Sequence, residues 1–408
     1  MVNISRDERQ DLCIDNWKKV GGRGTILAAT GFGKTRIALK VIKRLIEKKP
    51  DASILVIVPT DYLKGQWLLQ LAEWNLVQSV KVMIINSAIK ATLQCDLMVC
   101  DEVHEYAADT FSKVFELVKY KVLLCLTGTI NRLDGKEVLI KSYAPVCDEI
   151  TLATCLANKW LADYKEYKIL LEVDLTEYNK HNRAFLNHFS YFNYDFGTAM
   201  GCVSDYNIKL AFAKNTGNNV KDVTLHAMGF IRALKGRKDF VMNHPDKVRI
   251  ADIIIAHRED KKIITFSQTK AMAAAIKTGV VMHSGQTKKK REKVMEEFNA
   301  AEKGVLNSAK ALERGADIKG LSVSITLSFN SSSIAKQQKN GRSIRKEGDK
   351  ESEIYTLVIK GTMEEEWFKN SAKGLQYLTI MEDQLGHLLN GEEYKTKQEF
   401  DKPVMFRF

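Results

Sequence analysis

The residues that could do chemistry begin with a glycine-containing loop near the start of the chain. The loop follows a short apolar run at 25–28 and precedes Lys34, Thr35 and a helix-like run at 36–48. Glycine lets backbone N–H groups converge on phosphate oxygens, and the following helix N-terminus adds its positive dipole end. The pattern predicts a phosphate-binding loop in which Lys34 contacts the β- and γ-phosphates and the Thr35 hydroxyl binds Mg²⁺, with a chance glycine-rich turn as the alternative. The loop residues expected around the nucleotide are Thr30, Gly31, Phe32 and Gly33.

A pair of adjacent carboxylates, Asp101 and Glu102, follows a second apolar run at 96–100. Two carboxylates at the end of a buried strand are costly unless they meet a cation. Asp101 could hold the Mg²⁺ that Thr35 coordinates, and Glu102 could orient and deprotonate the water that attacks a phosphoryl group. An acidic surface turn is the alternative. Together with the phosphate loop, the pair predicts an ATP hydrolase that uses ATP and Mg²⁺.

Three further side chains could complete this site. Gln10, upstream of the loop, carries a donor and an acceptor that can bind the adenine edge. Arg342 and Arg345 are spaced so that they share one face of a helix. Guanidinium groups directed at the γ-phosphate stabilise the charge on the transferring group, which is worth on the order of 10³ to 10⁵ in rate. The arginines lie far along the chain from the phosphate loop, so the site would be divided between two domains. Such a division predicts a cleft that ATP closes and product release opens.

Alternating apolar and helical runs must position these groups. Strand-like runs at 25–28, 53–58, 96–100 and 122–126 alternate with helical segments, and the alternation resumes at 262–267. This order is typical of parallel α/β sheets, in which function lies at the carboxyl ends of the strands. A chain of 408 residues is too long for one core. We expect an α/β protein with domains at 1–164 and 165–372, a helical insertion at about 177–245, and a short helical tail at 373–408.

Aromatic and basic residues are interleaved in the expected insertion. Rings can stack on unpaired bases while cations follow the phosphates. Aromatic residues near helical spacing more often form a core, and a core is the favoured interpretation here. The aromatic residues are Phe185, Phe189, Tyr191, Phe192, Tyr194 and Phe196.

Composition limits the classes of protein that fit. A formal charge of +12 favours a polyanionic partner, nucleic acid first, although a generic basic surface is the alternative. No run approaches the roughly 18 apolar residues of a membrane span, and the N-terminus has no signal-peptide core. An intracellular, cytoplasmic protein without a membrane partner is expected. The seven cysteines include no C-x-x-C pair, which favours reduced thiols over zinc or disulfides.

Taken in order, the motifs resemble those of superfamily 2 helicases. They read A-x-x-G-x-G-K-T at 28–35, V-P-T-x-x-L-x-x-Q-W at 58–67, D-E-V-H at 101–104, T-G-T at 127–129 and Q-x-x-G-R-x-x-R at 338–345. The second motif is typical of the branch that holds XPB-type translocases and phage UvsW-like branch-migration helicases. The resemblance implies two tandem RecA-like domains with an ATP cleft between them.

The resemblance also implies roles for individual residues. Gly315 and Asp317, in the fifth motif, would contact the nucleotide. Coupling between the ATP and nucleic-acid sites would involve His104, Thr127, Thr129 and Gln338. Contacts with nucleic acid would involve Pro59, Thr60, Gln66, Arg132, Phe266, Ser267 and Ser308.

The expected activity is that of an ATP-dependent DNA helicase or translocase with 3′-to-5′ polarity. It would act as a monomer on duplex, forked or branched DNA in replication, recombination or repair, and the compact chain suits a phage or small accessory enzyme. An RNA helicase and the motor subunit of a restriction or defence complex remain alternatives. A catalytically silent nucleic-acid-binding module is a further alternative, against which Lys34, Glu102 and Arg342 argue.

Overall fold

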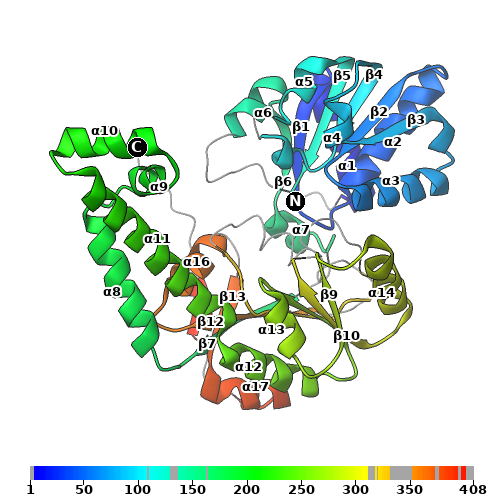
Figure 1. The fold of residues 1–408 in the computed structure, drawn as a ribbon. Coiled ribbons are helices and arrows are strands. Elements are labelled where there is room, and N and C mark those ends of the chain that lie inside the picture. Colours follow the sequence, from blue (N-terminus) through cyan, green and yellow to red (C-terminus); the bar gives the residue numbers. More distant parts are fainter. Residues whose placement is uncertain are drawn as a thin grey trace.

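A computed structural model shows two parallel sheets, each covered by helices, and a helical arm that leaves the second (Figure 1). The structure describes residues 4–107, 110–128, 137–161, 164–310, 318, 320–330, 352–372, 376–393 and 397–400. The two tandem α/β domains agree with the fold class that the sequence predicts.

The first sheet has the order β3-β2-β4-β5-β1-β6 in the described residues, and its strands pair in parallel. Its strands are β1 (Arg23–Ala28), β2 (Ile54–Val58), β3 (Val80–Ile84), β4 (Leu93–Cys100), β5 (Val118–Thr127) and β6 (Val146–Ile150). All five β2 residues are buried, because helices cover both faces of a parallel sheet. β5 lies between β4 and β1, which brings the ends of three motif-bearing strands to one edge.

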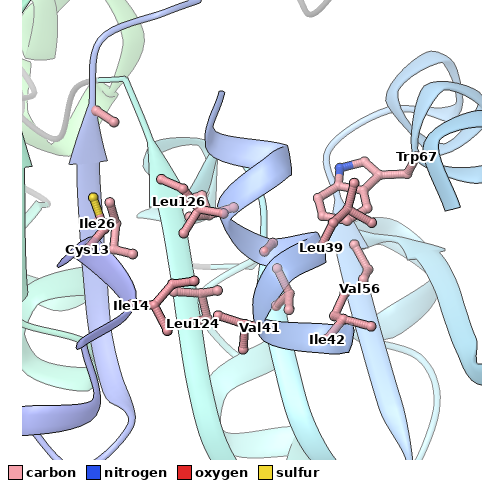
Figure 2. Close-up of a cluster of buried hydrophobic side chains, with 14 of the residues drawn as sticks. Cys13, Ile14, Ile26, Leu39, Val41, Ile42, Val56, Trp67, Leu124 and Leu126 are labelled. Carbon is pink, nitrogen blue, oxygen red and sulfur yellow. The ribbon is translucent and has the colours of Figure 1, made fainter. Parts of the chain in front are cut away.

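Helices and short turns connect these strands. They are α1 (Arg6–Lys19), α2 (Lys34–Lys48), α3 (Asp61–Glu73), η1 (Val77–Ser79), α4 (Ile85–Ala88), η2 (Val103–Ala107), α5 (Val114–Leu117), α6 (Glu137–Tyr143) and α7 (Leu152–Ala157). Along α2, the buried residues Ile37, Ala38, Val41 and Ile42 recur at helical spacing and form one apolar face. Figure 2 shows that this face packs against β2 and β5 in one continuous core.

The second sheet has the order β14-β13-β7-β12-β11-β8-β10-β9 in the described residues. Its strands are β7 (Tyr164–Leu171), β8 (Lys262–Ser267), β9 (Val280–His283), β10 (Gly304–Ala309), β11 (Val323–Thr326), β12 (Ser352–Ile359), β13 (Gln376–Met381) and β14 (Lys397–Phe400). All neighbours are parallel except β13 and β14. The helices of this domain are α12 (Pro245–Ala256), α13 (Lys270–Ala275), α14 (Lys288–Ala300), α16 (Met363–Ser371), η3 (Glu382–Gln384) and α17 (Leu385–Asn390).

The segment after residue 372 differs from the short helical tail that the sequence predicts. It contains helix α17, but β13 also joins β7 in the second sheet and β14 pairs with β13. Tyr377 and Ile380 are buried there. The apolar run of β13 is too short to distinguish a strand from a helix by periodicity.

The insertion between β7 and β8 is an arm of four helices, α8 (Thr176–Ser190), α9 (Phe196–Ser204), α10 (Tyr206–Thr216) and α11 (Val220–Asn243). In Figure 1, α8 and α11 run side by side and α9 and α10 lie at the far end. Phe185, Phe192 and Phe230 are buried in a separate core of the arm, whereas Tyr194 and Phe196 are exposed. The favoured core interpretation therefore holds for some of these aromatic residues only.

Two histidines on α8 pack against glycines on α11. A Cβ atom at Gly229 would lie 2.2 Å from Nε2 of His188, and one at Gly236 would lie 2.4 Å from Nδ1 of His181. The His188 ring also meets His226, with Nδ1 atoms 3.3 Å apart. The missing side chains allow the two helices to approach closely enough for these contacts.

Acidification is expected to destabilise the arm. Burial, and then the nearby His226, lower the pKa of His188 below its ordinary value of 6.5. The unfolded chain therefore binds more protons, and stability is lost as the pH falls below about 6.5. Urea unfolding between about pH 7.5 and about pH 5.5 should show a smaller loss in His188→Gln than in wild type, with exposed His257→Gln as the control. Equal losses in H188Q and wild type would contradict this prediction.

Among the described residues, no helix has both the length and the apolar character needed to cross a bilayer.

Candidate ATP site

The predicted phosphate loop lies between β1 and α2, at the carboxyl edge of the first sheet. Gly31 and Gly33 have positive φ angles of 90° and 102°, which glycine adopts without strain. A side chain at Gly33 would also collide, because its Cβ atom would lie 2.6 Å from Nε2 of Gln10. The backbone conformation therefore favours glycine here, and a side chain would also have to displace the Gln10 amide.

Two side chains of helix α1 form hydrogen bonds with the carbonyl groups of this loop. The amide of Gln10 donates a hydrogen bond to the carbonyl oxygen of Phe32 over 2.9 Å, and Nε of Arg6 donates to the same oxygen over 2.8 Å. Arg6 also donates to the Gly31 carbonyl. Gln10 is buried, and its Oε1 has no hydrogen-bond partner in the described part of the chain. Arg6 was not among the predicted site residues, although its spacing of four from Gln10 places both on one helix face.

The Lys34 side chain reaches across the sheet edge to the end of β4. Its Nζ lies 3.6 Å from Oε1 of Glu102, and the two side chains are 9% and 23% exposed. Gly128, just after β5, is also close, since a Cβ atom there would lie 3.5 Å from Lys34 Nζ and 3.2 Å from Thr30 Oγ1. The structure therefore brings together the predicted groups from the ends of β1, β4 and β5.

Asp101 is almost completely buried at the end of β4 and both of its carboxyl oxygens accept hydrogen bonds. Oδ2 accepts from the indole Nε1–H of Trp67 over 2.8 Å, and Oδ1 accepts from the backbone N–H of Glu102 over 3.0 Å. Burial, and then the charge of Glu102, raise the pKa of Asp101 to about 6. Carboxylate and hydroxyl oxygens are donors that a hard divalent cation prefers, so Asp101 and the Thr35 hydroxyl at the start of α2 are chemically suited to hold Mg²⁺.

A short chain of polar contacts links the ATP site to β5. Glu102 has a positive φ of 48°, unusual for a residue with a side chain. Its Oε2 lies 3.4 Å from Nδ1 of His104, and that nitrogen is hydrogen bonded to Oγ1 of Thr127 over 2.9 Å. His104 and Thr127 are buried. These contacts connect four residues in one series, Lys34, Glu102, His104 and Thr127. A coupling role for His104 and Thr127 would require such a connection.

The predicted nucleic-acid contacts of the first domain lie at the end of β2. Pro59 and Thr60 follow the strand, and the Thr60 hydroxyl accepts a hydrogen bond from the backbone N–H of Leu63, which caps α3. Gln66 donates to the Tyr62 hydroxyl over 3.0 Å. Tyr62 also packs against an apolar cluster of the second domain. Helix α3 therefore connects this segment with both domains.

The predicted contacts of the second domain lie on the neighbouring strands β8 and β10. Phe266, Ser267 and Ser308 are all buried. Ser267 Oγ donates to the carbonyl oxygen of Thr269 over 3.0 Å. The remaining predicted site residues lie outside the described residues: Thr129, Arg132, Gly315, Asp317, Gln338, Arg342 and Arg345.

The fold and the site define a class of protein, the two-domain ATPase motors with RecA-like domains. Two families match the sequence. The family described as "Type III restriction enzyme, res subunit" matches residues 4–93 and 77–132, and "Helicase conserved C-terminal domain" matches residues 246–347. The first match covers the phosphate loop and the carboxylate pair, and the second covers the part of the second domain that follows the helical arm, as far as residue 347.

The sequence is also similar to one relative, and the fold is similar to two solved structures. The DNA 3′-5′ translocase XPB2 of Sulfurisphaera tokodaii is 25% identical over 362 residues, which cover 83% of this chain and 78% of that protein. S. cerevisiae Dbp5 bound to RNA and ADP BeF3 superposes with a TM-score of 0.62 at 13% identity, over 93% of this chain and 91% of Dbp5. The ATP-dependent Type ISP restriction-modification enzyme LlaBIII bound to DNA gives 0.53 at 16% identity, over 87% of this chain and 28% of LlaBIII. The two family matches and the relative support a superfamily 2 helicase, an enzyme that hydrolyses ATP.

Proposed function

We propose that the protein is a DNA translocase or helicase of the XPB-like and UvsW-like branch, with a D-E-V-H motif at its ATP site. It hydrolyses ATP to move along, unwind or remodel duplex, forked or branched DNA in recombination or repair, with 3′-to-5′ polarity. The observation that carries this proposal is the connected series Lys34, Glu102, His104 and Thr127, next to the buried Asp101. The similarity to a DNA translocase over most of both chains supports DNA as the substrate.

Each described residue of the site has a place in this proposal. Lys34 binds the β- and γ-phosphates, and the N–H groups of the loop and of the α2 N-terminus surround them. Glu102 orients the attacking water and accepts its proton. Asp101 and Thr35 would hold Mg²⁺, which when bound neutralises charge on the phosphate oxygens. A movement of Glu102 would shift His104, and through the hydrogen bond from His104 it would also shift Thr127 at the end of β5.

The second domain completes the proposed site from across the cleft. We assign Arg342 and Arg345 to the γ-phosphate, Gly315 and Asp317 to the nucleotide, and Gln338 and Thr129 to coupling, as the resemblance implies. Charge stabilisation by a guanidinium from the second domain would make hydrolysis depend on domain closure. Tyr62, which already joins α3 to the second domain, gives closure a route to the nucleic-acid segment at Thr60 and Gln66.

The substrate is tested by measuring ATP turnover with a panel of nucleic acids. We expect DNA to stimulate turnover and RNA of the same sequence to leave it near the basal rate, and comparison of forks, four-way junctions, plain duplex and single strands identifies the preferred structure. Stimulation by RNA alone would contradict the DNA assignment and favour an RNA helicase.

A second candidate is the motor subunit of a restriction or defence complex. It is favoured by the match of residues 4–93 and 77–132 to the restriction-enzyme family. Purification of the tagged protein from its native host distinguishes the two, because a motor subunit should retain a nuclease partner in stoichiometric amounts and an independent translocase should not.

A further inference from the structure

Trp67 lies where helix α3 meets the carboxylate proposed to bind Mg²⁺. Its indole Nε1–H donates to Oδ2 of Asp101 over 2.8 Å, and the two residues are 1% and 5% exposed. An indole N–H that is removed from water needs a hydrogen-bond acceptor, and a buried carboxylate needs donors. The contact therefore satisfies the indole donor and one carboxylate oxygen, both of which are largely shielded from water.

The surroundings of the indole limit how Asp101 can move. Trp67 belongs to the same apolar cluster as Leu39 and Val56, and Figure 2 shows its ring beside these side chains. Leu39 lies on α2, the helix that begins with Lys34 and Thr35. The donor that fixes Oδ2 is thus held in place by the helix that carries the other proposed Mg²⁺ ligand.

The same helix also carries contacts that lie outside the ATP site. Thr60 caps α3, Gln66 precedes Trp67 directly, and Tyr62 packs against the second domain. A shift of α3, whether from nucleic acid at Thr60 and Gln66 or from domain closure at Tyr62, would move the indole relative to Asp101.

We propose that Trp67 is the positioning residue for the Asp101 carboxylate, and that it makes Mg²⁺ binding at the ATP site sensitive to the position of α3. The proposal rests on Asp101 being a metal ligand, as in the proposed function. In this proposal Trp67 does more than fill the core. Removal of its N–H group would abolish the positioning of Asp101 but would leave the packing of the aromatic ring. Hydrogen-bond partners of metal ligands typically contribute roughly 10- to 100-fold to metal affinity or activity.

The test compares ADP binding with Mg²⁺ and with EDTA in the full-length protein, using Trp67→Phe, which keeps an aromatic ring but removes the donor. We expect W67F to bind metal-free ADP like wild type, and to lose roughly tenfold of the gain in affinity that Mg²⁺ provides. Trp74→Phe is the matched control, because Trp74 ends the same helix with its ring facing Arg36 and should keep the full gain.

Two results would overturn the proposal. W67F could retain the full Mg²⁺ gain, or its affinities with and without Mg²⁺ could fall by the same factor, as expected for general damage to the fold. Asp101→Asn separates this proposal from the proposed function. If D101N loses the Mg²⁺ gain and W67F keeps it, only the role of Trp67 fails, whereas an unchanged gain in D101N refutes the metal assignment itself.

A measurement on wild type covers the case in which W67F does not fold. The chain has five tryptophans, so ¹⁵N-indole labelling gives five N–H signals. One of them is expected to shift when Mg²⁺ is added to the ADP-bound protein and to stay still in D101N. No shift of any indole signal on Mg²⁺ addition would overturn the proposal.

Discussion

Lys34→Ala is expected to reduce ATP turnover by at least about 100-fold, because it removes the ammonium group proposed to bind the β- and γ-phosphates. Lys34 Nζ lies 3.6 Å from Glu102 at the sheet edge and is close to Gly128. Turnover should be measured at saturating ATP with the most stimulatory nucleic acid, so that weak binding and slow hydrolysis are not confused.

Lys43→Ala is the matched control for this variant, since Lys43 is an exposed lysine on the same helix. It should retain wild-type turnover. Circular dichroism should be used to check that K34A is folded, because the Lys34 ammonium group of the wild type also balances the acids at the end of β4. A folded K34A with wild-type turnover would refute the phosphate-loop assignment.

The second large effect concerns the buried ion pair between Lys247 and Glu364, which is expected to be essential for stability. Both side chains are 0% exposed, and Nζ lies 2.5 Å from Oε1. Lys247 also donates to the carbonyl oxygen of Val241 over 2.6 Å, and Glu364 accepts from the backbone N–H of Ile359 over 3.1 Å. Burial raises the pKa of Glu364 and lowers that of Lys247, so each charge depends on the other.

Glu364→Gln should therefore lower the free energy of unfolding by about 3–5 kcal/mol, because it leaves the Lys247 charge buried without a counter-ion. Urea unfolding measures the loss, and Glu366→Gln, an exposed position on the same helix, should change it little. The double variant K247M/E364L should recover only part of the stability, since Val241 and Ile359 would lose their partners. An E364Q loss below about 1 kcal/mol would show that the pair is not a charged anchor.

The arrangement of the candidate ATP site could be predicted from the sequence in large part because its signals are local. The phosphate loop requires glycines directly between a strand and a helix, and the carboxylate pair directly follows a strand, so position along the chain fixes position at the sheet edge. In a parallel sheet these strand ends lie at the same edge, so the proximity of Lys34 and Glu102 can be predicted from the fold class alone. The contact between His104 and Thr127 also follows from the neighbouring places of β4 and β5.

Contacts made across the fold could not be predicted in the same way. Trp67 ends the V-P-T-x-x-L-x-x-Q-W motif, but its hydrogen bond to Asp101 depends on how α3 packs beside the end of β4. Lys247 and Glu364 are far apart in the chain, and charged residues in helices usually face water. Arg6 lies on a helix that is rich in charged residues, so no clear apolar face indicates the direction in which the Arg6 side chain points. In each case the missing information is tertiary.

The ion pair of Lys247 and Glu364 has a mechanical consequence for the arm. Lys247 on α12 bonds both Glu364 on α16 and the Val241 carbonyl near the end of α11. The Tyr178 hydroxyl on α8 also accepts a hydrogen bond from the backbone N–H of Met363. Helix α11 has 24 residues and is therefore about 36 Å long. With its base clamped in this way, the arm is expected to turn with the second domain as one body, so that a rotation of about 10° would move its far end by roughly 6 Å.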